Sequence, residues 1–353
     1  MRFTSLKYLL VFTTPIVVLF SLSMNGLWTY FALVFVFALI PLLEFLFTGN
    51  ENNMTALEEA IALEDKTYDY IIWSLVPMQL LTLVYFLVRV SDPSVLYYEK
   101  VGMMTAFGIS CGVLGINAAH ELGHRLTKHE HFMSKILLAT TLYMHFFIEH
   151  NRGHHKHVST DEDPASAKFG ENLYAFYVRS VRDSWLSAWQ IEKKRLAKAH
   201  QNFWSVHNEM LVYQIIQIAL LVIIAVFFNL ETLFWFINAA IMGFLLLETV
   251  NYIEHYGLRR QKVTDKQYEP VLPLHSWNSN HALGRILLLE LTRHSDHHYK
   301  ATRKYQILRH FNNSPQMPAG YPAMMLLALV PPLWFKVMHR QIAAYRPNFS
   351  HQL

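Results

Sequence analysis

Histidines in this 353-residue chain fall into short clusters whose spacing suits metal binding. Three pairs lie four residues apart, namely His120/His124, His150/His154 and His294/His298. On a helix, residues at i and i+4 share one face about one turn apart, so two imidazoles can bind one ion. His155 and His297 adjoin two of these pairs, and His255 lies in the segment 251–257. The spacing therefore predicts a metal site built from four distant segments.

The number of clustered histidines also bears on the number of ions. Catalytic zinc sites use three protein ligands and structural sites use four. Nine imidazoles exceed what one ion needs, so the sequence favours two metal ions. Imidazole binds iron, zinc, copper and nickel alike, and the residues alone leave the element open.

Acidic residues lie beside the clustered histidines and are expected to orient them, because a ligating histidine usually donates its other N–H to a carboxylate or carbonyl. These residues are Glu121, Glu149, Glu254 and Asp296. Direct metal ligation by one of them stays open. Of the remaining histidines, His157 and His281 are expected to lie nearest the metals or on the substrate side.

The composition indicates the environment of this site. The chain is 53% hydrophobic and only 16% charged, whereas a soluble domain has about 25% charged residues. This deficit predicts a membrane protein. The single cysteine, Cys111, excludes an internal disulfide framework and a cysteine-based zinc or iron–sulfur site. The net charge of +4 gives no argument for nucleic-acid binding.

Six stretches are long and apolar enough to cross a bilayer, which takes about 20 residues. They are 8–24, 27–48, 70–90, 101–118, 210–229 and 232–250. The stretches 132–148 and 323–338 are shorter, and Pro331 and Pro332 interrupt the second. We expect these two to form buried or interfacial helices.

Basic residues orient the predicted bundle. Of the 30 Lys and Arg residues, five precede residue 119, twelve lie in 119–208 and thirteen in 251–353. Positive segments stay in the cytoplasm, and six crossings put all four histidine segments on that side. We therefore predict one all-α integral membrane domain, 1–353, with six transmembrane helices. A cytoplasmic helical cap, 119–208 and 251–353, carries the histidine-rich dimetal site.

Four motifs resemble those of the membrane alkane 1-monooxygenases, which are non-haem di-iron enzymes within the fatty-acid-desaturase-like group. They are HELGHR (120–125), EHNRGHH (149–155), NYIEHYGL (251–258) and RHSDHH (293–298). NYIEHYGL is the most discriminating, since general desaturases lack it. The last motif follows Leu291-Thr292 where the family usually has Leu-Gln, a departure outside the histidines. The resemblance is close over about 100–335 and extends through 163–167, 275–281 and 315–322.

The resemblance implies two iron ions and hydroxylation of the terminal methyl of a medium-chain n-alkane by O2. It implies nine metal ligands: His120, His124, His150, His154, His155, His255, His294, His297 and His298. It also implies a bacterial inner-membrane location. Electrons come from rubredoxin, which an NAD(P)H-dependent rubredoxin reductase reduces. Because the chain has no CxxC pair, the rubredoxin must be a separate protein.

Substrate and donor contacts can also be assigned as expectations. An alkane offers only apolar surface, so aromatic residues of the second and sixth spans are candidate channel walls. They are Trp28, Tyr30, Phe31, Phe35, Phe37, Phe234, Trp235, Phe236 and Phe244. Basic residues near the metal motifs are candidates for docking an acidic donor, namely Lys156, Lys300, Arg303 and Lys304.

Other functions use similar residues. Xylene-type monooxygenases and membrane desaturases share such histidine motifs. An intramembrane zinc protease would use the HExxH string in 120–124 with Glu121 as general base, but it leaves six or more clustered histidines without a role. A metal transporter would place ionisable residues at the bilayer midplane, whereas here they cluster at span ends.

Overall fold

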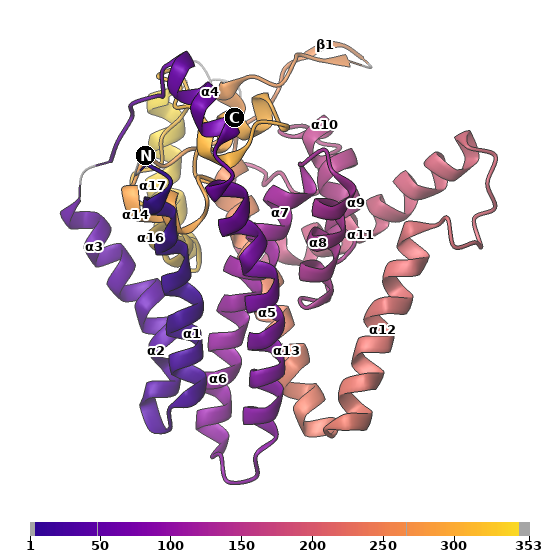
Figure 1. Ribbon diagram of the computed structural model, residues 1–353. Helices are drawn as coiled ribbons and strands as arrows, with labels where there is room; N and C mark the ends of the chain where they lie inside the picture. The colour runs from indigo at the N-terminus through magenta and orange to yellow at the C-terminus, as the bar shows by residue number, and fades with distance from the viewer. Residues whose placement is uncertain (1–3, 48, 266, 346–353) are drawn as a thin grey trace.

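The computed structural model describes residues 4–47, 49–265 and 267–345. Within these ranges the chain is predominantly helical, and its one sheet is a two-stranded antiparallel hairpin of β1 (Lys262–Thr264) and β2 (Gln267–Tyr268). Long helices stand side by side, and shorter ones gather at one end (Figure 1). The predicted all-α class is confirmed.

Within the described residues, six helical segments are apolar and long enough to cross a membrane, which confirms the predicted number. They are Leu6–Ser23, Gly26–Leu46, Thr67–Ser91, Tyr97–Gly123, Glu209–Phe227 and Leu230–His255. The first consists of the 3-10 helix η1 (Leu6–Phe12) and α1 (Thr13–Ser23). The third, fifth and sixth are the single helices α5, α12 and α13.

Two spans contain π-helical turns. The second is built from η2 (Gly26–Tyr30), α2 (Phe31–Val34), the π-helix η3 (Phe35–Leu39) and α3 (Ile40–Leu46). The fourth is built from α6 (Tyr97–Ser110), the π-helix η4 (Cys111–Ile116) and α7 (Asn117–Gly123). Such turns in helices are frequent at functional sites.

The fourth and sixth spans run five residues further than the predicted ends at 118 and 250. Each continues as helix beyond its apolar run, so that His120 and His255 lie on the spanning helices themselves. The additional residues are buried, and polar ones such as Glu254 find partners there. Hydropathy alone therefore ended both helices too early.

The remaining helices form a cap at one end of the bundle (Figure 1). They are α4 (Ala56–Glu64), α8 (Lys128–Ala139), α9 (Phe146–Glu149), η5 (His150–His154), α10 (His155–His157), α11 (Leu173–Lys198), η6 (Pro273–His275), α14 (Ala282–Leu287), α15 (His294–Tyr299), η7 (Tyr305–Ile307), α16 (Tyr321–Ala328) and α17 (Pro331–Tyr345). The stretches 132–148 and 323–338 are each divided between two helices, as expected of segments that do not span.

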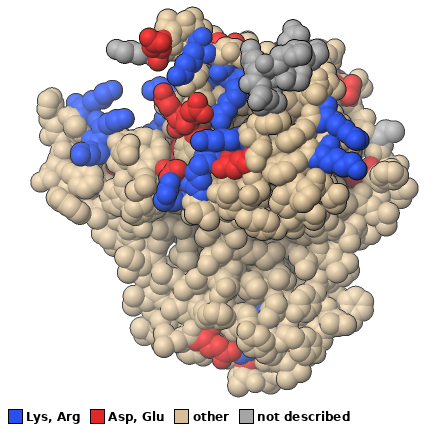
Figure 2. Space-filling model, turned by 180° about the vertical axis from the view of Figure 1, so that it is seen from behind, with Lys and Arg blue, Asp and Glu red and all other residues tan. Residues whose placement is uncertain are grey.

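Charged residues gather at the capped end of the molecule, and a belt below them is nearly free of charge (Figure 2). The first and last described parts of the chain also lie at the capped end (Figure 1). This separation is what a bilayer imposes, because a charge at its centre is costly. The chain is a multi-pass membrane protein.

Close packing of two helices places two histidine segments together. A Cβ added at Gly243 of α13 would lie 2.4 Å from Cβ of Cys111, and one added at Gly108 would lie 2.8 Å from the Met242 sulfur. The absent side chains let α13 approach the fourth span closely. The capped ends of both helices are thereby held near each other, with His120 on one and His255 on the other.

Candidate metal centre

The structure brings all nine clustered histidines together at the capped end, in two groups. One group of five is His120, His124, His150, His155 and His297, and one group of four is His154, His255, His294 and His298. In each group the candidate ligand atoms lie within 4.8 Å of one another. We refer to these as the five-histidine group and the four-histidine group.

Nitrogen atoms in the five-histidine group converge. The Nε2 atom of His150 lies 3.0 Å from that of His124 and 3.1 Å from that of His155. The Nε2 atom of His297 is 3.1 Å from that of His155. His120 presents a buried Nε2 that has no hydrogen-bond partner among the described residues.

The four-histidine group has the same character. The Nε2 atom of His294 lies 2.9 Å from that of His298 and 3.2 Å from that of His255. The Nε2 atom of His154 lies 3.2 Å from that of His298. Each group thus draws candidate ligands from both the spanning helices and the cap.

The His150/His154 pair divides between the two groups, contrary to the expectation that each i, i+4 pair binds one ion. The reason is the π-helix His150–His154, whose wider turn brings residues five apart onto one side. His150 therefore shares a group with His155, and His154 joins the other group. His120 and His124 lie together in one group, and His294 and His298 lie together in the other.

The geometry and protonation of both groups fit metal ions. Two nitrogens that each lie about 2.1 Å from one ion, with an N–ion–N angle of about 90°, would be about 3.0 Å apart. This is close to the separations observed. Burial lowers the pKa of His124 to about 3, and burial together with neighbouring imidazoles holds the pKa of His150 and His297 well below the usual range. Neutral imidazoles offer free lone pairs, which metal binding requires.

Glu254 contacts the four-histidine group at its metal-facing side. Its Oε2 atom lies 3.1 Å from Nε2 of His294, the same nitrogen that approaches His255 and His298. Its Oε1 atom accepts a 2.7 Å hydrogen bond from the Tyr321 hydroxyl. This position suits a ligand oxygen better than the orienting role expected from sequence, which would place the carboxylate at Nδ1.

Two of the other predicted orienting carboxylates are held by cations. Glu121 forms a 2.8 Å ion pair with Arg125 and accepts the Tyr305 N–H. Asp296 accepts the Arg309 N–H at 2.7 Å and lies 3.2 Å from Arg303. Both carboxylates therefore contact residues of the cap rather than orienting an imidazole. The ion pair also argues against Glu121 as the general base of a zinc protease.

Glu149, the fourth predicted orienting residue, packs against its own helical turn. Its Oε1 atom would lie 2.6 Å from a Cβ added at Gly153. Burial and the charges of Asp163 and Glu248 raise the pKa of the Glu149 carboxyl well above its usual value.

Asp163 orients a clustered histidine, and it was not singled out from the sequence. Its Oδ2 atom lies 2.9 Å from Nδ1 of His154 and accepts a hydrogen bond from Ser166. Burial opposes the charged form, but His154 and Ser166 hold the pKa of this carboxyl below its ordinary value. The available signal was its place in the segment 163–167, which the family resemblance includes.

Replacing Asp163 with asparagine is expected to weaken metal binding about 10–100-fold, the usual cost of losing a partner that orients a ligating histidine. The measurement is metal retained per chain against increasing chelator. Asp161→Asn is the matched control, because Asp161 is 74% exposed and pairs with Arg259. Equal retention by both variants would show that Asp163 does not orient a ligand.

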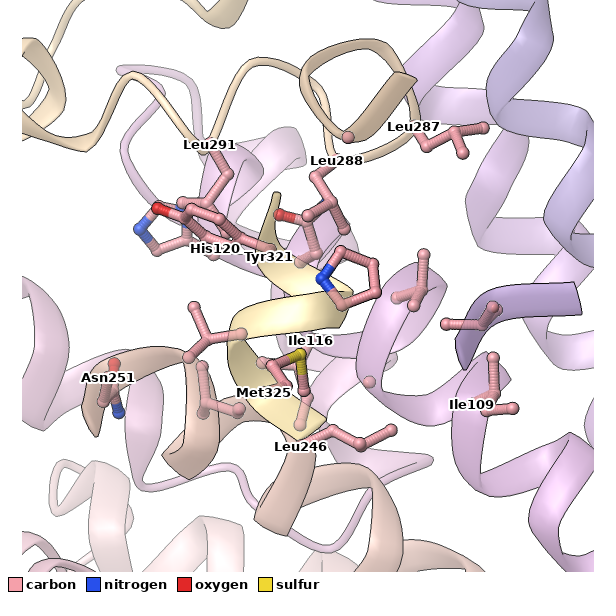
Figure 3. Close-up of a pocket in the computed structure, with 18 of the residues that line it drawn as sticks. Ile109, Ile116, His120, Leu246, Asn251, Leu287, Leu288, Leu291, Tyr321 and Met325 are labelled. Carbon is pink, nitrogen blue, oxygen red and sulfur yellow. The ribbon is translucent and has the colours of Figure 1, made fainter. Parts of the chain in front are cut away.

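An apolar cavity leads to the histidines. It encloses about 930 Å³ including its mouth, and His120, His150, His294 and Glu254 line it. Figure 3 shows His120 and Tyr321 on one side of this space and Ile109 and Leu246 further away. The other labelled lining residues are Ile116, Asn251, Leu287, Leu288, Leu291 and Met325.

Among the predicted aromatic channel walls, the structure places Phe37 in the cavity wall. The others lie elsewhere: Trp28 is 59% exposed, Phe244 stacks on Tyr143, and Trp235 packs against Tyr97. Trp28 and Trp235 lie near the uncapped ends of their helices, about one bilayer thickness from the histidines. Aliphatic side chains are the largest group in the wall instead.

Several polar residues near the cavity were not singled out from the sequence, although Asn251 begins the NYIEHYGL motif. Asn117 and Asn251 line the apolar space, and Tyr321 reaches Glu254. His145 is buried in a small polar pocket beside His150, together with Glu248. Tyr321 lies in the segment 315–322 of the resemblance, whereas His145 gave no signal beyond its residue type.

Two of the four predicted basic docking residues form ion pairs, and the other two are exposed. Lys304 lies 2.8 Å from Asp69, and Arg303 pairs with Asp296. Lys156 and Lys300 are exposed.

Of the two additional histidines, His157 contacts Glu162, and His281 contacts Ser279. Both lie outside the two histidine groups.

Comparisons with known proteins identify relatives. Residues 100–328 match the fatty acid desaturase family. An alkane 1-monooxygenase of Acinetobacter baylyi is 39% identical over 86% of this chain and 74% of its own length. One of Pseudomonas putida is 38% identical, over 92% and 80%. The hydroxylase component of a Pseudomonas putida xylene/toluene monooxygenase is 27% identical, over 71% and 65%.

Proposed function

Because this chain belongs to the alkane 1-monooxygenases of the fatty acid desaturase family, we propose that it hydroxylates the terminal methyl of medium-chain n-alkanes at a di-iron site. The five-histidine and four-histidine groups would each hold one iron ion, with Glu254 as a further ligand in the second. Bound iron would supply O2 activation, in which one oxygen atom enters the substrate and the other leaves as water.

The observation that carries this proposal is an apolar cavity that ends at the histidines. An alkane binds through burial alone, at about 0.8 kcal/mol per CH2, and the aliphatic wall supplies the surface. Partly exposed lining residues in the spans, Phe37, Gly112 and Leu246, provide an entry from the bilayer. The chain end would then meet the imidazoles without passing through water.

Residues at the inner end position the reacting methyl. Leu291 and Phe146 line the cavity beside His150 and His294, so apolar side chains surround the approach to the metals. Tyr321 holds Glu254 by its hydroxyl and fixes the carboxylate toward His294. This enclosure orients one terminal methyl and excludes bulk water from the reacting oxygen.

Product analysis tests the reaction directly. Anaerobically purified protein, loaded with iron and supplied with electrons, should convert members of a hexane-to-hexadecane series to 1-alkanols. Gas chromatography with mass spectrometry identifies the products. Formation of internal alkenes would indicate a desaturase, and a product only from xylene, as a benzylic alcohol, would indicate the xylene-type reaction. Either result would contradict the proposal.

A larger residue at the far end of the cavity should shorten the preferred alkane. Ile109 precedes His120 by eleven positions, which is about 16 Å along a helix. Ile109→Phe is expected to lower turnover of the longest accepted alkanes about tenfold or more while short ones are retained. Competition assays with mixed alkanes measure the change. Ile109→Leu keeps the volume and should keep the wild-type profile.

We propose that the capped end faces the cytoplasm of a bacterium and that the membrane is the inner one. Positive segments favour the cytoplasmic side, and the cap contains most of the Lys and Arg residues. A rubredoxin, reduced by an NAD(P)H-dependent reductase, would then deliver electrons there. Lys156 and Lys300 are the exposed members of the predicted docking set.

Reversing both charges tests this donor site. Lys156→Glu with Lys300→Glu should slow rubredoxin-dependent reduction about tenfold at low salt, because attraction between charged surfaces raises association rates. The difference should diminish as salt rises. Stopped-flow reduction of the iron protein measures it, with Lys193→Glu as an exposed control on α11. Unchanged rates and salt dependence would refute docking at Lys156 and Lys300.

A further inference from the structure

A polar crevice lies at the capped end of the first span, apart from the metal centre. Its space, together with the open solvent at its mouth, is about 640 Å³, and its walls include Lys7, Asn52, Arg285 and Arg293. It therefore joins the start of η1 to α14 and to the loop that leads into His294. The crevice contributes no residue to the two histidine groups.

Three cations in this crevice share one buried carboxylate. Glu290 is 2% exposed and lies 2.7 Å from Arg285, 3.7 Å from Lys7 and 3.8 Å from Arg293. It also accepts a 2.6 Å hydrogen bond from the Tyr8 hydroxyl. One carboxylate cannot neutralise three cations, so positive charge remains around Glu290.

The second carboxylate that lines the crevice, Glu58, takes part in the N-terminal cap of its own helix, α4. Its Oε2 atom accepts hydrogen bonds of 2.9 Å from the N–H and the hydroxyl of Thr55, at the start of α4. Among the described residues that line the crevice, three cations and two carboxylates leave one net positive charge. Arg285 and Arg293 are buried, whereas Lys7 is partly exposed, so an anion bound between them would supply the missing negative charge.

Donors are also available in the crevice. The Lys7 ammonium is 40% exposed and lies beyond hydrogen-bond distance from Glu290. Arg293 donates to the carbonyls of Leu308 and Asn52, while its buried Nε has no hydrogen-bond partner among the described residues.

We propose that this crevice binds a phosphate group, supplied by the headgroup of an anionic phospholipid. Arg and Lys are the residues that bind phosphate oxygens by charge-assisted hydrogen bonds. The membrane is the favoured source because exposed apolar residues of the first two spans lie next to the crevice in sequence. They are Leu6, Leu9, Leu10, Phe45 and Leu46, each at least 43% exposed.

The position of Arg293 gives the site a structural consequence. Arg293 directly precedes His294, and Arg285 donates to the Asn50 carbonyl after the second span. A phosphate group bridging Lys7 and Arg285 would fasten the first span to the cap. The bound lipid would thereby brace the loop that carries the third histidine cluster.

Native mass spectrometry of the full chain in detergent tests the proposal. Phosphatidylglycerol, phosphatidylcholine and inorganic phosphate are titrated separately. Wild-type protein should retain one phosphatidylglycerol more tightly than phosphatidylcholine, and Lys7→Glu should weaken this binding about tenfold or more. Lys193→Glu makes the same charge change on the exposed part of α11 and should bind as wild type does.

Each outcome decides the proposal. If Lys7→Glu and wild type retain phosphatidylglycerol equally, the crevice is not the binding site. If inorganic phosphate binds in a Lys7-dependent way but the lipid does not, the phosphate site stands and its lipid source is refuted. Arg285→Gln provides a second variant, and an unchanged elution volume and circular dichroism spectrum confirm that each variant is folded.

Discussion

Replacing His255 with alanine is expected to remove iron from the four-histidine group and to reduce alkane hydroxylation more than about 100-fold. Loss of a partner that merely orients a ligand already costs about 10–100-fold, and His255 presents its own Nε2 to His294 at 3.2 Å. The five-histidine group is left complete, so the iron content should fall from two ions towards one. Elemental analysis and product yield measure both effects.

A histidine outside both groups supplies the control for His255→Ala. His281 lies in the cap, contacts Ser279 and belongs to neither group. His281→Ala should keep both iron ions and most of the activity. If His255→Ala instead retained two ions and full turnover, His255 would not be a ligand.

Replacing Glu254 with glutamine should also reduce turnover more than about 100-fold, for an electrostatic reason. Nine neutral imidazoles contribute no negative charge to offset the two divalent ions of the proposed site. Glu254 contacts the metal-facing nitrogen of His294, and Asp163 contacts the far nitrogen of His154. An amide at 254 keeps the shape but removes the charge, and buried cations without a counter-charge are costly.

The measurement for Glu254→Gln is iron content together with turnover, at several chelator concentrations. Glu231→Gln is the control, since Glu231 lies at the opposite end of the same helix and is 58% exposed. Its ion pair with Lys100 is partly solvated and contributes little. Wild-type iron affinity and turnover in Glu254→Gln would show that this carboxylate does not bind metal.

Much of the architecture could be predicted from the sequence, because a bilayer imposes strong requirements. An apolar run of about 20 residues has few alternatives to a spanning helix, so all six spans were found. The histidine clusters were equally visible, since His120, His150 and His294 each have a companion four residues on. Their convergence followed from placing all four segments on one side of the membrane.

The finer structure of the site depended on features that spacing does not encode. The π-helical turn at 150–154 moves His154 out of the group that holds His150. Whether a carboxylate orients or ligates depends on which imidazole nitrogen it faces. Glu254 could therefore be assigned only from its contact with Nε2 of His294, and Asp163 only from Nδ1 of His154.

The channel walls show a second limit of sequence reasoning. Aromatic residues suggest an apolar wall by type alone, but the cavity occupies only the capped half of the bundle. Residues near the uncapped ends, such as Trp28 and Trp235, are too far along their helices to reach it. The depth of a cavity is set by how helices pack, as at Gly243 and Cys111.

The most direct test of the account is the position of iron itself. Anomalous diffraction from crystals of the anaerobically purified protein, collected on both sides of the iron absorption edge, locates each ion. We predict two iron peaks, one among the five histidines around His150 and one among the four around His294. A single peak, or peaks that appear at the zinc edge and not at the iron edge, would contradict the di-iron assignment.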